Sequence, residues 1–279
     1  ARDVEKLNFA AVIADRDDWT SGVIDAARKG GSLGIAISIQ GERVSLVPEL
    51  AQIGGGPFAQ NPDEPGIGVL TSGTTGAPKR IHIRMPILER AAISASAQVE
   101  SSANEPPDLV FWPFGGIGGI CQVLGAGYVG KRMVLLEKFT VEDWVGAVKR
   151  HHITKVGVQP TVIRMLLEAK VPREDIASLQ FIFGGSAPLE YSTQKQFEET
   201  YGLPVIWGYG ATEFAGTIIA WTPDLYKQFG ARKPGSIGKP FPGVQLRVIN
   251  PDTGSDVAPG EHGYLEALVP LVNKDWVRT

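Results

Sequence analysis

Short β-rich runs alternate with longer helical patterns along most of this sequence, and that alternation restricts the fold more than any other feature. Between Asp108 and Trp207, strands are expected to alternate regularly with helical segments. Alternation with helices of this length is typical of a parallel sheet covered by helices on both faces. We therefore expect an α/β fold, with a mainly parallel sheet flanked by helices.

The pattern changes after about Tyr226. Residues 233–253 are rich in glycine and proline, and strands are expected at Gln245–Ile249 and Gly263–Val269 around a turn. We expect an α/β nucleotide-binding subdomain over residues 1–225 and the start of a β-rich subdomain, a truncated distorted barrel, over residues 226–279. Near the N-terminus, Leu33–Ile39 and Arg43–Val47 are predicted to form a hairpin.

Charge and cysteine content exclude several classes of protein. The 27 basic and 30 acidic residues give a net charge of −3, which argues against a nucleic-acid partner or an anionic membrane surface. The single cysteine, Cys121, cannot form an intrachain disulfide and is interpreted as a packing residue. Because no apolar run has the length of a membrane helix or the form of a signal peptide, we expect a soluble, cytoplasmic protein without a membrane span.

A run of hydroxyl-bearing residues and glycines follows the apolar strand predicted at 66–70. It reads Thr71, Ser72, Gly73, Thr74, Thr75, Gly76, Ala77, Pro78 and Lys79. Glycines let backbone N–H groups approach an oxyanion, while the hydroxyls and the ammonium add donors and charge. It is not a Walker A loop, because proline precedes the lysine and arginine follows it. The sequence predicts a phosphate site here; a flexible polar surface loop is the alternative.

A second polar segment, Trp207–Glu213, follows the strand predicted at Pro204–Ile206. Tyr209 can stack on a purine, Thr212 can donate to a phosphate, and Glu213 is an oxygen ligand suited to Mg²⁺. The alternative is that Tyr209 packs in the core while Glu213 is solvated. A third segment, Phe183–Leu189, is predicted as a turn between a strand and a helix.

These segments resemble the acyl-adenylate-forming superfamily, which includes acyl-CoA synthetases, firefly luciferase and peptide-synthetase adenylation domains. Thr71 to Gly76 and Lys79 match its Thr-Ser-Gly-Thr-Thr-Gly-x-Pro-Lys signature, and 209–213 match Tyr-Gly-x-Thr-Glu. The resemblance implies that the first loop holds the β- and γ-phosphates of ATP. It further implies an adenosine and α-phosphate site made by Gly185, Ser186, Ala187, Pro188, Tyr209, Gly210, Ala211 and Thr212.

The resemblance implies an enzyme that activates a carboxylic acid with ATP, releasing pyrophosphate, and then forms a thioester with coenzyme A. Lys79, Thr212 and Glu213 are the expected catalytic residues, with Glu213 holding Mg²⁺. ATP, Mg²⁺ and coenzyme A are the expected cofactors, and a small-molecule carboxylic acid is the expected substrate. No acidic residue lies between Val110 and Leu136 to pair with an amino group, so a fatty or aryl acid is favoured over an amino acid.

The sequence departs from the family pattern in three places. Arg80 stands where the family usually has glycine, and Gly116 where many acyl-CoA synthetases have histidine. The chain ends at Thr279, before the family's Gly-Asp and its small lysine-bearing C-terminal domain. We therefore expect a core fragment that is inactive or weakly active by itself.

Several alternatives stay open. The chain could belong to a carrier-protein-loading adenylation domain, to a luciferase-like oxygenase or to a non-catalytic nucleotide-binding module. The segment Gly125–Gly130 has the spacing GxGxxG, but it precedes a predicted strand instead of following one, which argues against an NAD site. A homodimer is neither required nor excluded.

Overall fold

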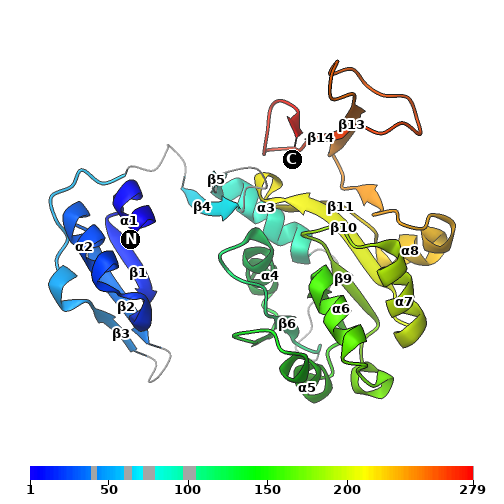
Figure 1. The fold of residues 1–279 in the computed structure, drawn as a ribbon, viewed down its shortest axis with the longest axis horizontal. Helices are drawn as coiled ribbons and strands as arrows, with labels where there is room; N and C mark the ends of the chain where they lie inside the picture. Colours follow the sequence, from blue (N-terminus) through cyan, green and yellow to red (C-terminus); the bar gives the residue numbers. More distant parts are fainter. Residues whose placement is uncertain (39–42, 60–64, 72–78, 97–104, 279) are drawn as a thin grey trace. The chain divides into compact units, whose positions relative to one another are not determined.

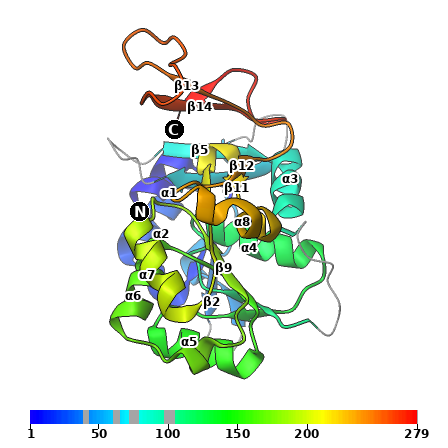
Figure 2. The ribbon, with the colours of Figure 1, turned by 90° about the vertical axis from the view of Figure 1, so that its right-hand side faces the viewer.

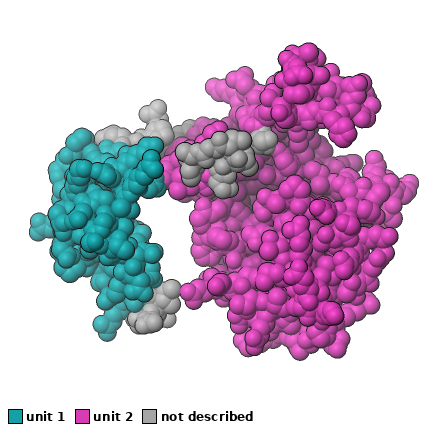
Figure 3. Space-filling model, in the orientation of Figure 1, with its two compact units in different colours: residues 1–65 teal, residues 66–279 magenta. Residues whose placement is uncertain are grey.

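The computed structural model describes residues 1–38, 43–59, 65–71, 79–96 and 105–278. The chain divides into two compact units, residues 1–65 and residues 66–279 (Figure 3). The subdomain boundary predicted between residues 225 and 226 falls inside the second unit and stays a prediction.

The first unit is a three-stranded sheet with helices. Strand β1 (Ala11–Asp15) runs parallel to β2 (Leu33–Ser38), and β2 pairs antiparallel with β3 (Arg43–Leu46), as the predicted hairpin requires. The turn predicted at Gln40-Gly41 lies outside the described residues. The other elements are α1 (Arg2–Leu7), η1 (Arg16–Asp18), α2 (Ser21–Gly30) and η2 (Pro48–Leu50).

Alternation along β2 shows how this unit buries its core. Ala36 is buried in a cluster with Ala27 of α2, whereas Ile37, the next residue, points the other way and is exposed. Helix α2 ends at Gly31, whose positive φ of 70° is the usual left-handed helix end.

A five-stranded sheet forms the body of the second unit, in the order β12-β11-β10-β9-β8. Strands β8 (Lys155–Val158), β9 (Phe181–Gly184) and β10 (Val205–Ala211) are parallel. Strands β11 (Gly216–Ala220) and β12 (Lys239–Pro240) continue the sheet antiparallel. The sheet is therefore mixed, and the expectation of a mainly parallel sheet holds only for β8, β9 and β10. A separate parallel pair joins β6 (Asp108–Val110) to β7 (Met133–Leu135).

Helices cover both faces of this sheet. Figures 1 and 2 show α6 (Pro160–Glu168) and α7 (Tyr191–Tyr201) on one face and α3 (Met85–Ser96) and α4 (Ile117–Tyr128) on the other. Helix α5 (Val141–His151) has the predicted bounds, and the Thr140 hydroxyl caps it by accepting from the Asp143 N–H (3.0 Å). The main core includes the fully buried side chains of Trp144, Ile163, Leu166, Ile182 and Phe197.

The strand before the predicted phosphate loop is not part of the parallel body. Strand β4 (Gly66–Thr71) pairs antiparallel with β5 (Lys79–Arg84) through six facing residue pairs, from Gly66↔Arg84 to Thr71↔Lys79. The sequence reading missed β5. The strand before the loop therefore lies outside the five-stranded sheet and pairs with the strand that follows the loop.

The last part of the chain is an antiparallel sheet of β13 (Gln245–Ile249), β14 (Tyr264–Leu268) and β15 (Val277–Arg278). Buried Glu266 accepts from Arg247 (2.7 and 2.9 Å) and from Arg278 (3.3 Å), and these ion pairs lower its pKa. The barrel expected here stays a prediction. The remaining elements are η3 (Arg173–Ile176), η4 (Thr212–Phe214), α8 (Pro223–Phe229) and η5 (Gly230–Arg232). Within the described ranges, no helix is long and apolar enough to span a bilayer.

Candidate functional site

The two ends of the predicted phosphate loop face each other at the end of the β4–β5 hairpin. Thr71 and Lys79 are paired, and the Thr71 hydroxyl donates to the Lys79 carbonyl (3.4 Å). Thr71 is half-buried and Lys79 is exposed. Ser72, Gly73, Thr74, Thr75 and Gly76 lie outside the described residues. The antiparallel pair thus fixes both ends of the loop on one ribbon.

The second predicted segment is strand for most of its length. Tyr209, Gly210 and Ala211 belong to β10, which extends beyond the predicted end at Ile206, and only Thr212 and Glu213 lie in the turn η4. The ladder between β10 and β11 is irregular between Tyr209 and Gly210. Such an irregularity bends a strand and redirects its side chains.

The side chains of this segment are half-buried. Tyr209 packs against a cluster that includes Phe214 and Ile218, while Thr212 and Glu213 are also half-buried. Within the described part of the chain, no three His, Cys, Asp or Glu side chains gather as a metal site. A single carboxylate is still adequate for Mg²⁺, which commonly keeps water and substrate phosphates as its other ligands.

The hairpin and the turn η4 belong to one packed cluster. Ala215, directly after η4, is buried with Val69 of β4 and Ile83 of β5. Three residues of α3 complete the cluster: Ile87, Leu88 and Ala91. Strand β5 also contacts η4 directly. The fold therefore brings the element that begins with Lys79 against the turn that carries Thr212 and Glu213, although more than 130 residues separate them in the sequence.

The third predicted segment runs beside β10. The Trp207 indole N–H donates to the Ala187 carbonyl (3.1 Å), and a Cβ added at Gly185 would lie 3.1 Å from the Gly208 carbonyl oxygen. Ser186 has a positive φ of 67°, a region that non-glycine residues seldom occupy. The backbone of this segment is therefore held close to β10 in a conformation that its surroundings must support.

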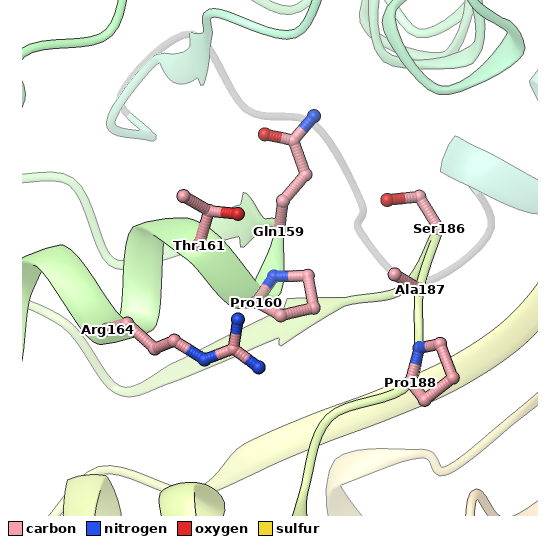
Figure 4. A pocket seen from close by; sticks show the side chains of 7 residues that line it. All are labelled: Gln159, Pro160, Thr161, Arg164, Ser186, Ala187 and Pro188. Atoms are coloured by element: carbon pink, nitrogen blue, oxygen red, sulfur yellow. The ribbon is translucent and has the colours of Figure 1, made fainter. Parts of the chain in front are cut away.

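An open cavity of about 480 Å³ adjoins the same segment (Figure 4). Ser186, Ala187 and Pro188 line one side, and Gln159, Pro160, Thr161 and Arg164 line the other. The second group lies at the end of β8 and the start of α6. Carboxyl ends of neighbouring parallel strands are the usual place for ligands in α/β sheets. Among the described residues, the lining of this cavity carries two hydroxyls, an amide and a guanidinium, and no carboxylate.

Sequence reasoning missed Gln159, Thr161 and Arg164. Their segment has no glycine-rich or charged pattern, and its relevance comes from β8 lying next to β9 in the sheet. It also missed Arg90 of α3, whose Nη2 donates to the Phe214 carbonyl (2.6 Å) at the end of η4. Burial lowers the pKa of Arg90 and raises the pKa of the nearby Cys121 thiol to about 11.

The family model described as AMP-binding enzyme matches residues 8–270 of the chain. The chain belongs to the AMP-binding enzyme family. The match covers both units, including the first sixty-odd residues, where the sequence shows no signature.

Individual relatives differ in the acid that their names specify. The chain is 30% identical over 211 residues to a long-chain-fatty-acid–CoA ligase of Bacillus subtilis, covering 74% of this chain and 36% of that protein. It is 27% identical to a structure of o-succinylbenzoate CoA synthetase from Bacillus subtilis with a product analogue (TM-score 0.64, 75% of this chain, 41% of that one). ATP-bound MatB from Rhodopseudomonas palustris shares the fold (TM-score 0.75, 24% identity, 96% and 52%).

The chain spans well under half the length of the curated relatives it matches. It covers 36% of the fatty-acid ligase and 43% of a probable CoA ligase of Humulus lupulus. The family match covers nearly all of this chain. The activity of the whole protein, of which this chain is a part, is treated as a proposal.

Proposed function

We propose that the protein of which this chain forms part activates a carboxylic acid with ATP and passes the acyl group to coenzyme A. We base this proposal on one observation: the β4–β5 hairpin, whose loop end carries Lys79, packs against the residues around η4, the turn that carries Thr212 and Glu213. Family membership and relatives named as CoA ligases support it. The varied acids in those names leave a fatty or an aryl acid as the proposed substrate class.

In the first step, the substrate carboxylate attacks the α-phosphorus of ATP, and the bond to the leaving pyrophosphate breaks. Lys79 and the Thr71 hydroxyl stand at the base of the predicted phosphate loop, where they would hold the pyrophosphate. Thr212 would donate to the α-phosphate, and Glu213 would hold Mg²⁺, which supplies positive charge against the charge that develops on the phosphates. Stabilisation of this kind is electrostatic and positional, so it depends on groups fixed before the reaction.

The adenosine would lie against the segment 185–188 on one side and Tyr209 on the other. The backbone of this segment is held beside β10 by the Trp207–Ala187 bond, which suits a planar base between backbone and an aromatic ring. In the second step, the thiol of coenzyme A attacks the acyl carbon, AMP leaves, and the thiol proton goes to solvent.

The test is carboxylate-dependent exchange of pyrophosphate into ATP by the full-length gene product, with fatty, aryl and amino acids assayed in parallel. Exchange with fatty or aryl acids, followed by thioester formation when coenzyme A is added, is the expected result. Exchange with amino acids only would favour a carrier-loading domain. ATP binding without exchange for any acid would leave a nucleotide-binding module.

A further inference from the structure

Two side chains from neighbouring helices hold the backbone at the end of the turn that carries Glu213, namely at its last residue and the residue that follows. Arg90 of α3 donates from Nη2 to the Phe214 carbonyl (2.6 Å). Cys121 of α4 donates from Sγ to the Ala215 carbonyl (3.6 Å). Because α3 and α4 pack against one another, the two donors form one support on the interior side of η4.

These carbonyls need partners that the turn itself cannot provide. The last carbonyls of a helical turn have no acceptor role within it, and η4 has only three residues. Phe214 and Ala215 are 1% and 2% exposed, so water cannot satisfy them. Ala215 also has a positive φ of 56°, and its N–H returns to the Thr212 carbonyl (3.0 Å). A strained residue of this kind persists only when its surroundings hold it.

Placing the guanidinium of Arg90 here costs free energy of desolvation, although it satisfies one carbonyl. Burial lowers its pKa, and its Nε is buried without a hydrogen-bond partner. Across the described residues, no carboxylate forms an ion pair with it. A half-buried cation without a counter-charge costs stability compared with an apolar side chain. The role of Arg90 is therefore better explained by the position in which it holds the backbone than by a gain in stability.

We propose that Arg90 is a positioning residue that fixes η4, so that Thr212 and Glu213 keep the orientation needed for the magnesium–nucleotide complex. This inference rests on the proposed function. The bonded carbonyl belongs to the residue after Glu213, so a shift at Phe214 moves the carboxylate directly. Cys121 supplies a second and weaker contact, because a thiol is a poor donor.

The test compares Arg90→Met with the unmodified full-length gene product. Methionine fills similar space but cannot donate. We expect the maximal rate of pyrophosphate exchange to fall about 10- to 100-fold, since displacements of about 1 Å cost up to that factor. The Mg²⁺ concentration for half-maximal exchange should rise, while KM for the acid stays unchanged. Arg90→Lys, which keeps a charged donor, should recover part of the loss.

Arg84→Met is the matched control. Arg84 also donates from Nη2 to a backbone carbonyl, that of the exposed residue Leu271 (2.8 Å), but this bond holds a segment remote in sequence from η4. We expect Arg84→Met to change thermal stability and leave the Mg²⁺ dependence unchanged. Equal changes in the two variants, or wild-type Mg²⁺ dependence in Arg90→Met, would overturn the inference.

A second readout separates this inference from the proposed function. Mg²⁺-dependent affinity for ATP, measured by calorimetry on the same variants, does not require turnover. An unmodified protein that binds Mg·ATP without exchange contradicts the proposed function, and Arg90 is then judged by whether Arg90→Met weakens the Mg²⁺ dependence of binding. An unmodified protein that binds no ATP contradicts both.

Discussion

The body of the second unit and its candidate site are built in different ways. The body, formed by α5, α6, α7 and strands β8 to β10, buries large side chains completely, among them Trp144 and Phe197. The site uses small or half-buried residues, and two of its positions, Ser186 and Ala215, have positive φ. The packing of the body therefore fixes where the strands end, while a few specific contacts fix the backbone at those ends.

The largest effect is expected from Phe197→Ala in the body. Phe197 is 0% exposed and lies with its ring 4.7 Å from that of Tyr201, so removing it leaves a cavity. The free energy of unfolding should fall by about 3–5 kcal/mol. Denaturant titration measures this loss. ATP affinity at a temperature where the variant is folded should match the unmodified protein, and a large loss of affinity would break the separation between body and site.

The opposite result is expected from Glu213→Gln at the site. The amide keeps the shape of the side chain but loses the charge that would hold Mg²⁺. Pyrophosphate exchange by the full-length protein should fall about 10- to 100-fold, equivalent to about 1.4–2.7 kcal/mol of transition-state stabilisation. Unfolding free energy should be unchanged. Unaltered exchange kinetics would remove Glu213 from the metal role.

Tyr226→Phe tests a polar contact within the body. Glu198 accepts from the Tyr226 hydroxyl and from the Val205 N–H (2.9 Å), while the Gln194 amide donates to Tyr226 (3.0 Å). Removing the hydroxyl leaves part of this buried network unsatisfied, so the free energy of unfolding should fall by about 1–2 kcal/mol. Because the network lies at the beginning of β10, nucleotide affinity should not change. Calorimetric unfolding and ATP titration check the two statements.

Ser186→Gly should stabilise the protein, whereas most substitutions lower the free energy of unfolding. Glycine adopts a positive φ without the cost that a side chain carries, so the variant should gain up to about 1 kcal/mol of stability. Ser186→Ala is the control, because it removes the same hydroxyl and keeps the strain. If both variants are equally stable, the backbone at residue 186 is not strained as its φ indicates. Thermal unfolding of the pair decides.

The smallest effect concerns Cys121. Burial raises its thiol pKa from 9.0 to about 11, so the folded protein keeps the proton at neutral pH. Alkylation by iodoacetamide should be slow at pH 7–8 and should accelerate only as pH approaches about 11. The unfolded chain loses the same proton near pH 9, so this group stabilises the fold below that pH and the contribution is lost as pH rises to about 11. Fast alkylation at pH 7 would contradict this.

Much of the body can be predicted from local patterns. The periodicity gives α5 of the body with the observed bounds, and likewise β13 of the last sheet, because each carries its own apolar pattern and turn residues. Pairing partners are harder. Strand β5 alternates Ile81 and Ile83 with charged or polar residues, yet no strand is predicted there from the sequence. Its strand character depends on β4 lying beside it.

The residues of the candidate site also fall into two groups, those that the local sequence identifies and those that only the fold brings together. The aromatic, hydroxyl and acidic residues of 209–213 indicate nucleotide chemistry by themselves, whereas 185–188 is predicted only through the family resemblance. The motifs do not identify Gln159 or Arg164, which join the cavity because of strand order, nor Arg90, which reaches η4 from a distant helix. Residues whose role depends on a neighbour far along the chain have no local signature.

The irregular ladder between β10 and β11 has a consequence for how sequences of this kind can vary. A Cβ at Gly210 would collide with the Gly216 carbonyl on the facing strand, which is backbone and cannot rotate away. Random mutagenesis with selection for folded protein should therefore leave position 210 as glycine. The requirement for glycine at position 210 thus limits how this segment can vary. Variants that fold should keep the same backbone path leading to Thr212 and Glu213.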